Sequence, residues 1–266
     1  MDYPFADVSL SRRLERCEAD TNAAMVESRA RLFPETGAAW IDVNGAYALF
    51  DSVQSPLTQT FGFGLFAPPT NDDLAKLEDF LSSRGAPVFH EVSALAAPET
   101  LEVLGNRGYR PVELTSILYR PIVATQSESR VRARIIHEGE EELWSATAAE
   151  GWSETPGLGE FLNALGRVSA AARGTSVFLA ELDGRAIGTG AVAIHNGIAL
   201  LAGASTIPSQ RNQGAQKALL EARLRHAVEQ GCDLAMMGAS SGSASQRNAE
   251  RQGFRIAYTR IKWGRT

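Results

Sequence analysis

The stretch STIPSQRNQGAQKALLEARLRHA, Ser205 to Ala227, changes character twice within a short length. An apolar run closes at Pro208, a polar hinge containing Gly214 follows, and a long leucine-rich segment comes next. Apolar residues after the hinge recur at helical spacing, which predicts a helix that begins directly after the glycine. A strand that enters a helix through a glycine turn leaves the first helical amides without partners. Because these amides and the helix dipole favour an anion, the stretch predicts a phosphate cradle.

The sequence around this hinge repeats one plan twice. A shift of 145 positions places Gly108 and Tyr109 on Gly253 and Phe254, and it places Leu74 on Leu219. Both halves read as a strand, a long helix, a strand, a short helix, a glycine followed by an aromatic residue, and a last strand. This agreement predicts a duplicated architecture with domains at residues 1–125 and 126–266, joined by the polar segment 121–133.

Local patterns predict the elements that surround the hinge. Apolar residues at helical spacing predict an opening helix over residues 8–32. Thr70 or Asn71 is the expected N-cap of a second long helix, because acidic residues follow it. Asparagine or aspartate followed by glycine is the strongest short hairpin signal, and it predicts tight turns between strands. These pairs are Asn44-Gly45, Asp183-Gly184 and Asn196-Gly197.

Composition restricts the class of protein. The chain has 266 residues, with 26 lysines and arginines against 31 aspartates and glutamates. This slightly acidic balance gives no basic face for nucleic acid or an anionic membrane. No run reaches the roughly 18 apolar residues needed to span a bilayer. The two cysteines, Cys17 and Cys232, lack metal-site spacing. We therefore expect a cytoplasmic protein without a metal, a membrane or a nucleic-acid partner.

The hinge resembles a motif of the GNAT superfamily of N-acetyltransferases. That family holds the pyrophosphate of acetyl coenzyme A with an Arg/Gln-x-x-Gly-x-Gly/Ala turn between a strand and a long helix. Arg211-Asn212-Gln213-Gly214-Ala215-Gln216 agrees at the first four positions, whereas Gln216 replaces the usual small residue. The segment ERQGF, Glu250 to Phe254, looks like a second landmark of the family. The resemblance covers residues 132–264, and by element order also the first half.

The resemblance implies a fold and a cofactor site. The implied fold class is α/β (α+β), with two tandem GNAT-like domains, each a mixed, mostly antiparallel sheet flanked by helices. Acetyl-CoA would lie along the strand before the hinge, with residues 234–237 across a splay between two strands. The residues implied in cofactor binding are Ser205, Thr206, Ile207, Arg211, Asn212, Gln213, Gly214, Ala215, Gln216, Ser245 and Asn248.

The first half provides an internal control for this motif. The same shift of 145 positions places Arg211 to Gln216 on Phe66 to Asn71, which contains Pro68 and Pro69. Proline has no backbone N–H, so this turn lacks two donors together with the glycine and the arginine. The first half is therefore interpreted as a degenerate copy that packs against the second or shapes the acceptor site.

The residues that move protons are less well marked. Many family members place a tyrosine where this sequence has Ala249. The remaining candidates for the acid are Ser245 and Tyr258, for which a helix cap and a packing role are the alternatives. Among the acidic residues, Glu150 and Glu154 are candidates for the base that would deprotonate an amine.

Taken together, the sequence predicts an acyltransferase, a GNAT-type N-acetyltransferase that uses acetyl-CoA as co-substrate. The acceptor would be a primary amine of a small molecule or a protein. The alternative is a non-catalytic acyl-CoA-binding or regulatory module, favoured by the missing tyrosine. A P-loop or dinucleotide-binding enzyme is disfavoured, because neither GxxxxGK[ST] nor GxGxxG occurs. The oligomeric state stays open, with a homodimer among the options.

Overall fold

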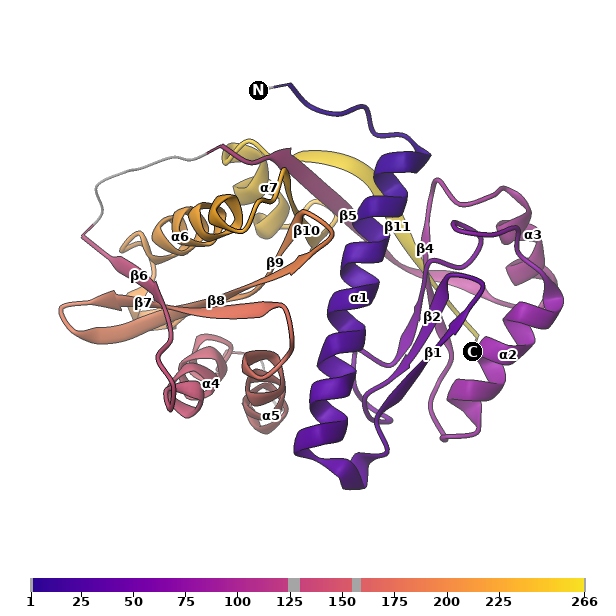
Figure 1. Ribbon diagram of the computed structural model, residues 1–266, viewed down its shortest axis with the longest axis horizontal. Helices are drawn as coiled ribbons and strands as arrows, with labels where there is room; N and C mark the ends of the chain where they lie inside the picture. The colour runs from indigo at the N-terminus through magenta and orange to yellow at the C-terminus, as the bar shows by residue number, and fades with distance from the viewer. Residues whose placement is uncertain (1, 124–129, 155–158, 266) are drawn as a thin grey trace. The chain divides into compact units, whose positions relative to one another are not determined.

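The computed structural model describes residues 2–123, 130–154 and 159–265 (Figure 1). Its α-helices are α1 (Val8–Leu32), α2 (Asn71–Ser82), α3 (Glu99–Asn106), α4 (Glu141–Gly151), α5 (Gly159–Ala170), α6 (Ala215–Glu229) and α7 (Ala244–Arg251). Its strands are β1 (Ala39–Val43), β2 (Ala46–Phe50), β3 (Gln59–Phe61), β4 (Phe89–Ser93), β5 (Arg110–Pro121), β6 (Arg132–Ile135), β7 (Thr175–Leu182), β8 (Arg185–His195), β9 (Ile198–Thr206), β10 (Leu234–Ser240) and β11 (Arg255–Gly264). Short 3₁₀ helices are η1 (Pro34–Thr36) and η2 (Pro208–Gln210).

The chain forms two compact units. The first comprises Met1–Arg120 together with Met236–Thr266, and the second comprises Pro121–Ala235. The join predicted over residues 121–133 lies partly outside the described residues, at 124–129. The predicted domains 1–125 and 126–266 stay a prediction about ancestry. The compact units differ from them, because residues 236–266 belong to the first unit.

The first unit is a mostly antiparallel sheet between helices. Its strands follow the order β1-β2-β3-β4-β11-β5, and β3 and β4 form the parallel pair. In Figure 1, α1 covers one face of this sheet, and α2 and α3 cover the other. The apolar core beneath α2 includes Leu74, Leu77 and Tyr109. Asn44 and Gly45 have φ of 50° and 87°, as the predicted two-residue turn between β1 and β2 requires.

The last strand of the chain, β11, lies inside the first unit. It pairs antiparallel with β4 on one side, where Arg260 faces Ser93, and with β5 on the other, where Arg260 faces Thr115. The repeat found in the sequence did not predict this placement. Strand pairing is set by long-range contacts, and periodicity reports only which face of a strand is buried.

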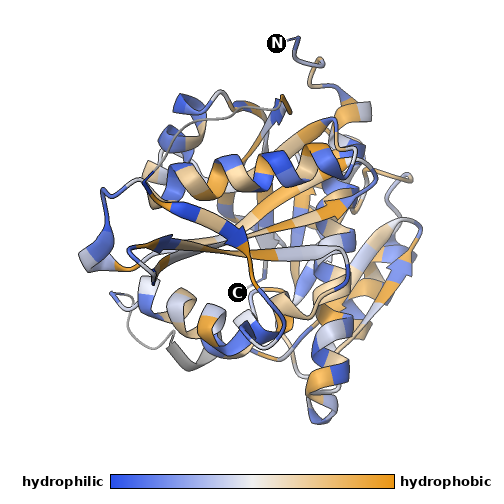
Figure 2. Cartoon of the chain, turned by 60° about the vertical axis from the view of Figure 1, so that its left-hand side comes forward, coloured by the Kyte–Doolittle hydropathy of each residue, from blue (hydrophilic) through white to orange (hydrophobic). Residues whose placement is uncertain are grey.

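The second unit is an antiparallel meander in the order β9-β8-β7-β6. Both turns predicted here are confirmed, because Asp183 and Gly184 have φ of 51° and 77°, and Asn196 and Gly197 have φ of 51° and 75°. α6 covers one face of the meander, and α4 and α5 cover the other (Figure 1). Hydrophobic and hydrophilic residues lie side by side on the helices, as amphipathic packing on a sheet requires (Figure 2).

The described structure confirms the fold class predicted from the sequence, since each unit is a mostly antiparallel sheet flanked by helices. The opening helix has the expected bounds, Val8–Leu32, and Thr70 caps α2 by accepting a hydrogen bond from the amide of Asp73. Within the described ranges, no helix combines the length and the apolar character that a membrane crossing needs.

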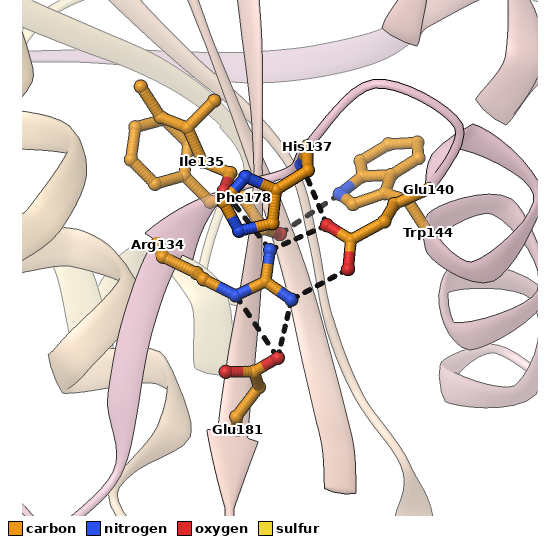
Figure 3. A network of polar contacts seen from close by, with 7 residues as sticks. All are labelled: Arg134, Ile135, His137, Glu140, Trp144, Phe178 and Glu181. Atoms are coloured by element: carbon orange, nitrogen blue, oxygen red, sulfur yellow. Dashed lines mark hydrogen bonds and ion pairs between the residues drawn. The ribbon is translucent and has the colours of Figure 1, made fainter. Parts of the chain in front are cut away.

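A charged network fixes the start of α4 against the meander (Figure 3). Arg134 donates two hydrogen bonds to the carboxylate of Glu140, at 2.6 and 2.8 Å, and two to Glu181 on β7, at 2.6 and 3.1 Å. The Glu140 carboxylate also accepts from the amide of His137. The Arg134 guanidinium and this amide lower the pKa of Glu140 to about 2. Glu140 therefore remains ionised as an anchor of the helix start.

We expect Glu140→Gln to lower the midpoint of thermal unfolding more than Glu142→Gln does. The first change replaces an ionised acceptor of three hydrogen bonds, whereas Glu142 lies exposed on the same helix. The difference should be present at pH 7 and should shrink as pH falls, because a lowered pKa contributes stability only while the carboxylate is ionised. Circular dichroism melts of both variants from pH 3 to pH 7 measure it, and equal melting points at pH 7 would contradict it.

Candidate functional site

The hinge joins β9 to α6 through two residues with left-handed backbone conformation. β9 ends at Thr206, η2 follows, and Asn212 and Gly214 have φ of 65° and 90°. Gly214 is the N-cap of α6 and receives no side-chain capping bond. Asparagine and glycine are the residues that adopt this conformation at least cost. Left-handed residues within a turn can direct neighbouring N–H groups toward a bound anion.

The amides of residues 212–217 are unoccupied within the described part of the chain. The Gln210 amide donates to Ile207 O, and the Arg211 amide donates to Pro208 O. The next backbone donor with an acceptor is Ala218, which bonds to Gly214 O at 3.0 Å. No described carbonyl or side chain accepts a hydrogen bond from the amides of residues 212–217. Because the four residues Arg211 to Gly214 are exposed, the predicted cradle is open to solvent.

Arg211 and Glu154 lie together at this hinge. Their side chains form an ion pair of 2.7 Å, and both are about half exposed, at 48% and 62%. Sequence reasoning considered Arg211 for phosphate and Glu154 for the base, and did not predict that they pair. The Glu154 carboxylate thus contacts the guanidinium that the sequence predicts to bind phosphate.

The side chain of Gln216, the residue that departs from the family motif, turns away from the amides. Its Nε2 donates to Ser205 O at 3.0 Å and to Thr206 Oγ1 at 2.7 Å. Gln216 therefore ties the first turn of α6 to the end of β9. The backbone amide of Gln216 belongs to the predicted cradle, whereas its side chain holds β9 and α6 together.

The strand segment that leads into the hinge is firmly held. Thr206 faces Gly188 in the ladder with β8, and the amide of Ile207 donates to Ile187 O at 3.0 Å. Ser205 is buried and its hydroxyl lies 2.8 Å from that of Thr189. Gly151 at the end of α4 permits this packing, because a Cβ there would lie 2.4 Å from Ser205 Oγ. The structure thus brings Ser205, Thr206 and Ile207 together with the cradle.

Of the proton-transfer candidates, Glu150 and Glu154 belong to the same unit as the hinge, and Glu154 is the partner of Arg211. Glu150 makes no such contact among the described residues. Glu150 is exposed on the last turn of α4. Ser245 and Asn248 are exposed on α7, which belongs to the first unit. Ser243 is the N-cap of α7 and accepts from the amide of Gln246, so the alternative that Ser245 caps this helix is wrong.

Tyr258 is buried in the first unit and has a partner of its own. Its hydroxyl donates to Glu15 Oε1 at 2.8 Å. Burial and the nearby Glu15 carboxylate raise the pKa of Tyr258 well above its usual value. A phenol in this environment keeps its proton. In the described geometry the Tyr258 hydroxyl serves to bind the buried Glu15 carboxyl group. Its assignment as the acid stays a prediction.

Sequence reasoning missed Arg223, a buried arginine on α6 beneath the end of β9. Its side chain contacts backbone carbonyls of both β8 and β9. A signal was present in the sequence, because Arg223 follows Leu219 by four residues and interrupts the apolar stripe of the helix.

The fold of the chain is similar to that of solved acetyltransferase structures. A GCN5-related N-acetyltransferase from Kribbella flavida is similar in fold, with a TM-score of 0.65 at 19% identity over 91% of this chain and 95% of that one. A putative GNAT-family acetyltransferase from Novosphingobium aromaticivorans has a TM-score of 0.54 at 16% identity, over 90% and 96% of the two chains. A tandem GNAT protein from the clavulanic acid biosynthesis pathway has a TM-score of 0.57 at 12% identity, over 96% and 93%.

The sequence itself supports the same family. Residues 138–254 match the model of the acetyltransferase (GNAT) family. This segment contains the hinge, β9, α6 and the ERQGF landmark, so the resemblance stated from those residues is confirmed for it. No curated protein matches the chain in sequence. The family match and the fold support acyl transfer as the general activity.

Proposed function

We propose that this chain is an N-acetyltransferase that transfers the acetyl group of acetyl-CoA to a primary amine of a small molecule or a protein. The observation that carries this proposal is the run of unoccupied amides from Asn212 to Lys217 at the mouth of α6. Charge-assisted hydrogen bonds of this kind contribute roughly 1.5–3 kcal/mol each. Free amides at a helix N-terminus favour an anion, and the diphosphate of acetyl-CoA is the anion that this proposal assigns to them.

The residues around the cradle have separate functions in this proposal. The amides and Arg211 hold the pyrophosphate, and β9 from Ser205 to Ile207 lies beside the acyl arm. In the reaction the amine nitrogen bonds to the acyl carbon, the carbon–sulfur bond breaks, and the sulfur leaves as a thiolate. A base takes the proton of the amine, and we assign Glu150 to it because the carboxylate of Glu154 is paired with Arg211. Ser245 and Tyr258 remain the candidates for the acid, with Asn248 as a cofactor contact.

We further propose that residues 1–125 are a degenerate copy of the acetyltransferase domain at 126–266. The turn that corresponds to the cradle contains Pro68 and Pro69, which lack amide hydrogens. Phe66 at its start lies beneath the Arg16 guanidinium, 4.1 Å from the ring centroid. An aromatic–cation stack of this kind stabilises the turn without a ligand.

Titration calorimetry with acetyl-CoA, followed by a thiol-release assay over a panel of amines, tests the proposed function. We expect binding with one site per chain and thiol release with at least one class of amine. Binding without release on any amine would contradict catalysis and favour a binding module. An absence of binding would contradict the cradle itself.

The Arg211–Glu154 pair leads to a prediction on affinity. Glu154→Gln should tighten acetyl-CoA binding about two- to threefold. The phosphate then no longer competes with the Glu154 carboxylate for Arg211, and an exposed ion pair of this kind contributes roughly 0.2–1 kcal/mol. Glu142→Gln, an exposed residue of α4, is the control and should leave the dissociation constant unchanged. Calorimetry at low ionic strength measures both. Weaker binding by Glu154→Gln would instead make Glu154 a direct ligand contact.

A further inference from the structure

β9 is irregular just before the segment that leads to the cradle. In the ladder with β8, Thr189 faces Ser205 and Ala191 faces Ala202, so Gly203 and Ala204 together oppose the single residue between Thr189 and Ala191. Gly203 has φ of 58°, a left-handed conformation that glycine adopts without strain. This is a β-bulge, which bends a strand and changes the direction of the residues that follow.

Side chains hold the two carbonyls at this bulge. Arg223 Nη1 donates to Ala202 O at 3.3 Å, and it donates to Ala191 O on β8 at 3.2 Å. Thr189 Oγ1 donates to Gly203 O at 3.2 Å. One guanidinium nitrogen therefore bridges the two strands at the place where their register shifts.

The environment of Arg223 is built for this contact. Its side chain is 4% exposed, and Nε donates to Leu219 O within α6. Gly190 provides the necessary space, because a Cβ there would lie 3.1 Å from Arg223 Cζ. No described carboxylate forms an ion pair with Arg223, and burial lowers its pKa to about 10. A buried cation with only carbonyl partners is costly, so its presence calls for a function beyond packing.

α6 thus contacts β9 at two positions along the helix. Gln216 in its first turn bonds to Ser205 O, and Arg223 two turns later bonds to Ala202 O. The helix whose mouth forms the cradle therefore also fixes the bulge, and Ser205 lies between the two contacts. Any shift of the bulge moves Ser205 and Thr206 relative to the amides of the cradle.

We infer that Arg223 is a positioning residue, which holds the bulged end of β9 so that the acyl arm of acetyl-CoA and its diphosphate are received in one fixed geometry. This inference rests on the proposed function, because it assumes that the arm lies along β9. Arg223 touches neither part of the ligand. It acts through the carbonyls of Ala202 and Ala191.

Two probes separate positioning from a general loss of structure. ADP contains the diphosphate without the acyl arm, whereas acetyl-CoA contains both. Arg223→Met should raise the dissociation constant of acetyl-CoA at least tenfold and leave that of ADP within twofold, because the amides at the helix mouth persist. Arg225→Met removes an exposed cation from the same helix and should change neither constant.

A milder variant keeps the test decisive if Arg223→Met does not fold. Gly190→Ala keeps the arginine and pushes a methyl group against its guanidinium, and it should weaken acetyl-CoA binding in the same direction by a smaller factor. Equal losses for ADP and acetyl-CoA, or unchanged acetyl-CoA binding in folded variants, would overturn the inference. If the wild-type chain binds neither ADP nor acetyl-CoA, the proposed function itself is wrong. That result differs from a failure of the inference on Arg223, in which the wild-type chain still binds.

Discussion

Gly214→Pro is expected to weaken acetyl-CoA binding at least tenfold. Proline has no amide hydrogen, and its ring fixes φ near −65°, whereas Gly214 has φ of 90°. The change therefore removes one donor and turns its neighbours away from the concavity. Loss of a single charge-assisted bond of about 1.5–3 kcal/mol corresponds to roughly 10- to 100-fold in the dissociation constant. Titration calorimetry of the two proteins with acetyl-CoA measures the loss.

The control for this variant lies at the other end of the same helix. Gly231 follows α6, has φ of 78° and, like Gly214, has open space where a Cβ would be. Its amide donates to Val228 O at 2.9 Å, so Gly231→Pro disturbs the backbone at least as much. We expect Gly231→Pro to lower thermal stability and to keep acetyl-CoA binding within about threefold. Equal losses of affinity in the two variants would show that the free amides have no specific role.

The hinge could be predicted because its signals are local. The left-handed φ at Gly214, the start of α6 at Ala215 and the turns at Asn44-Gly45 and Asn196-Gly197 follow from residues within one or two turns of chain. The same holds for Thr70, whose capping bond joins it to an amide three residues away. Such features need no knowledge of which segments meet in space.

The contacts of the hinge could not be predicted because they connect distant segments. Arg211 pairs with Glu154 across 57 positions, and Arg223 bonds to a carbonyl of β8 across 32. Gln216 shows the same limit at short range, since the motif places its amide but does not determine where a flexible side chain turns. The insertion of β11 between β4 and β5 depends on strand register, which a repeat in the sequence does not determine.

The first unit contains a buried charged cluster that ties α1 to the sheet. Glu15 is fully buried, accepts from Tyr258 at 2.8 Å, and lies 3.6 Å from Arg260 Nη1. Arg260 also binds Glu18 with two bonds of 2.7 and 2.8 Å, and its Nε lies 3.2 Å from Glu91. These acidic groups compete for one guanidinium. Glu15 has the weakest contact with it, and Glu15 Oε2 accepts no hydrogen bond from the described residues.

Burial is the main reason that the pKa of Glu15 rises from 4.5 to about 7, and Glu18 and Glu91 add to it while Arg260 and the Tyr258 hydroxyl oppose it. Because the folded value lies above the unfolded one, the protonated form is favoured by folding. Its stability contribution is complete below pH 4.5 and is lost as pH rises through 7. A change from 4.5 to about 7 corresponds to on the order of 3 kcal/mol.

Glu15→Gln, which imitates the protonated acid, should therefore increase the free energy of unfolding of the first unit at pH 8.5 by about 1–3 kcal/mol, and should have little effect at pH 5. Urea titrations at both pH values, followed by circular dichroism, measure the difference. Glu113→Gln is the control, because the Glu113 side chain is half exposed and contacts Lys262 at 3.5 Å. Destabilisation by Glu15→Gln at pH 8.5 would mean that Glu15 is ionised in the folded chain and that its attraction to Arg260 exceeds the cost of its burial.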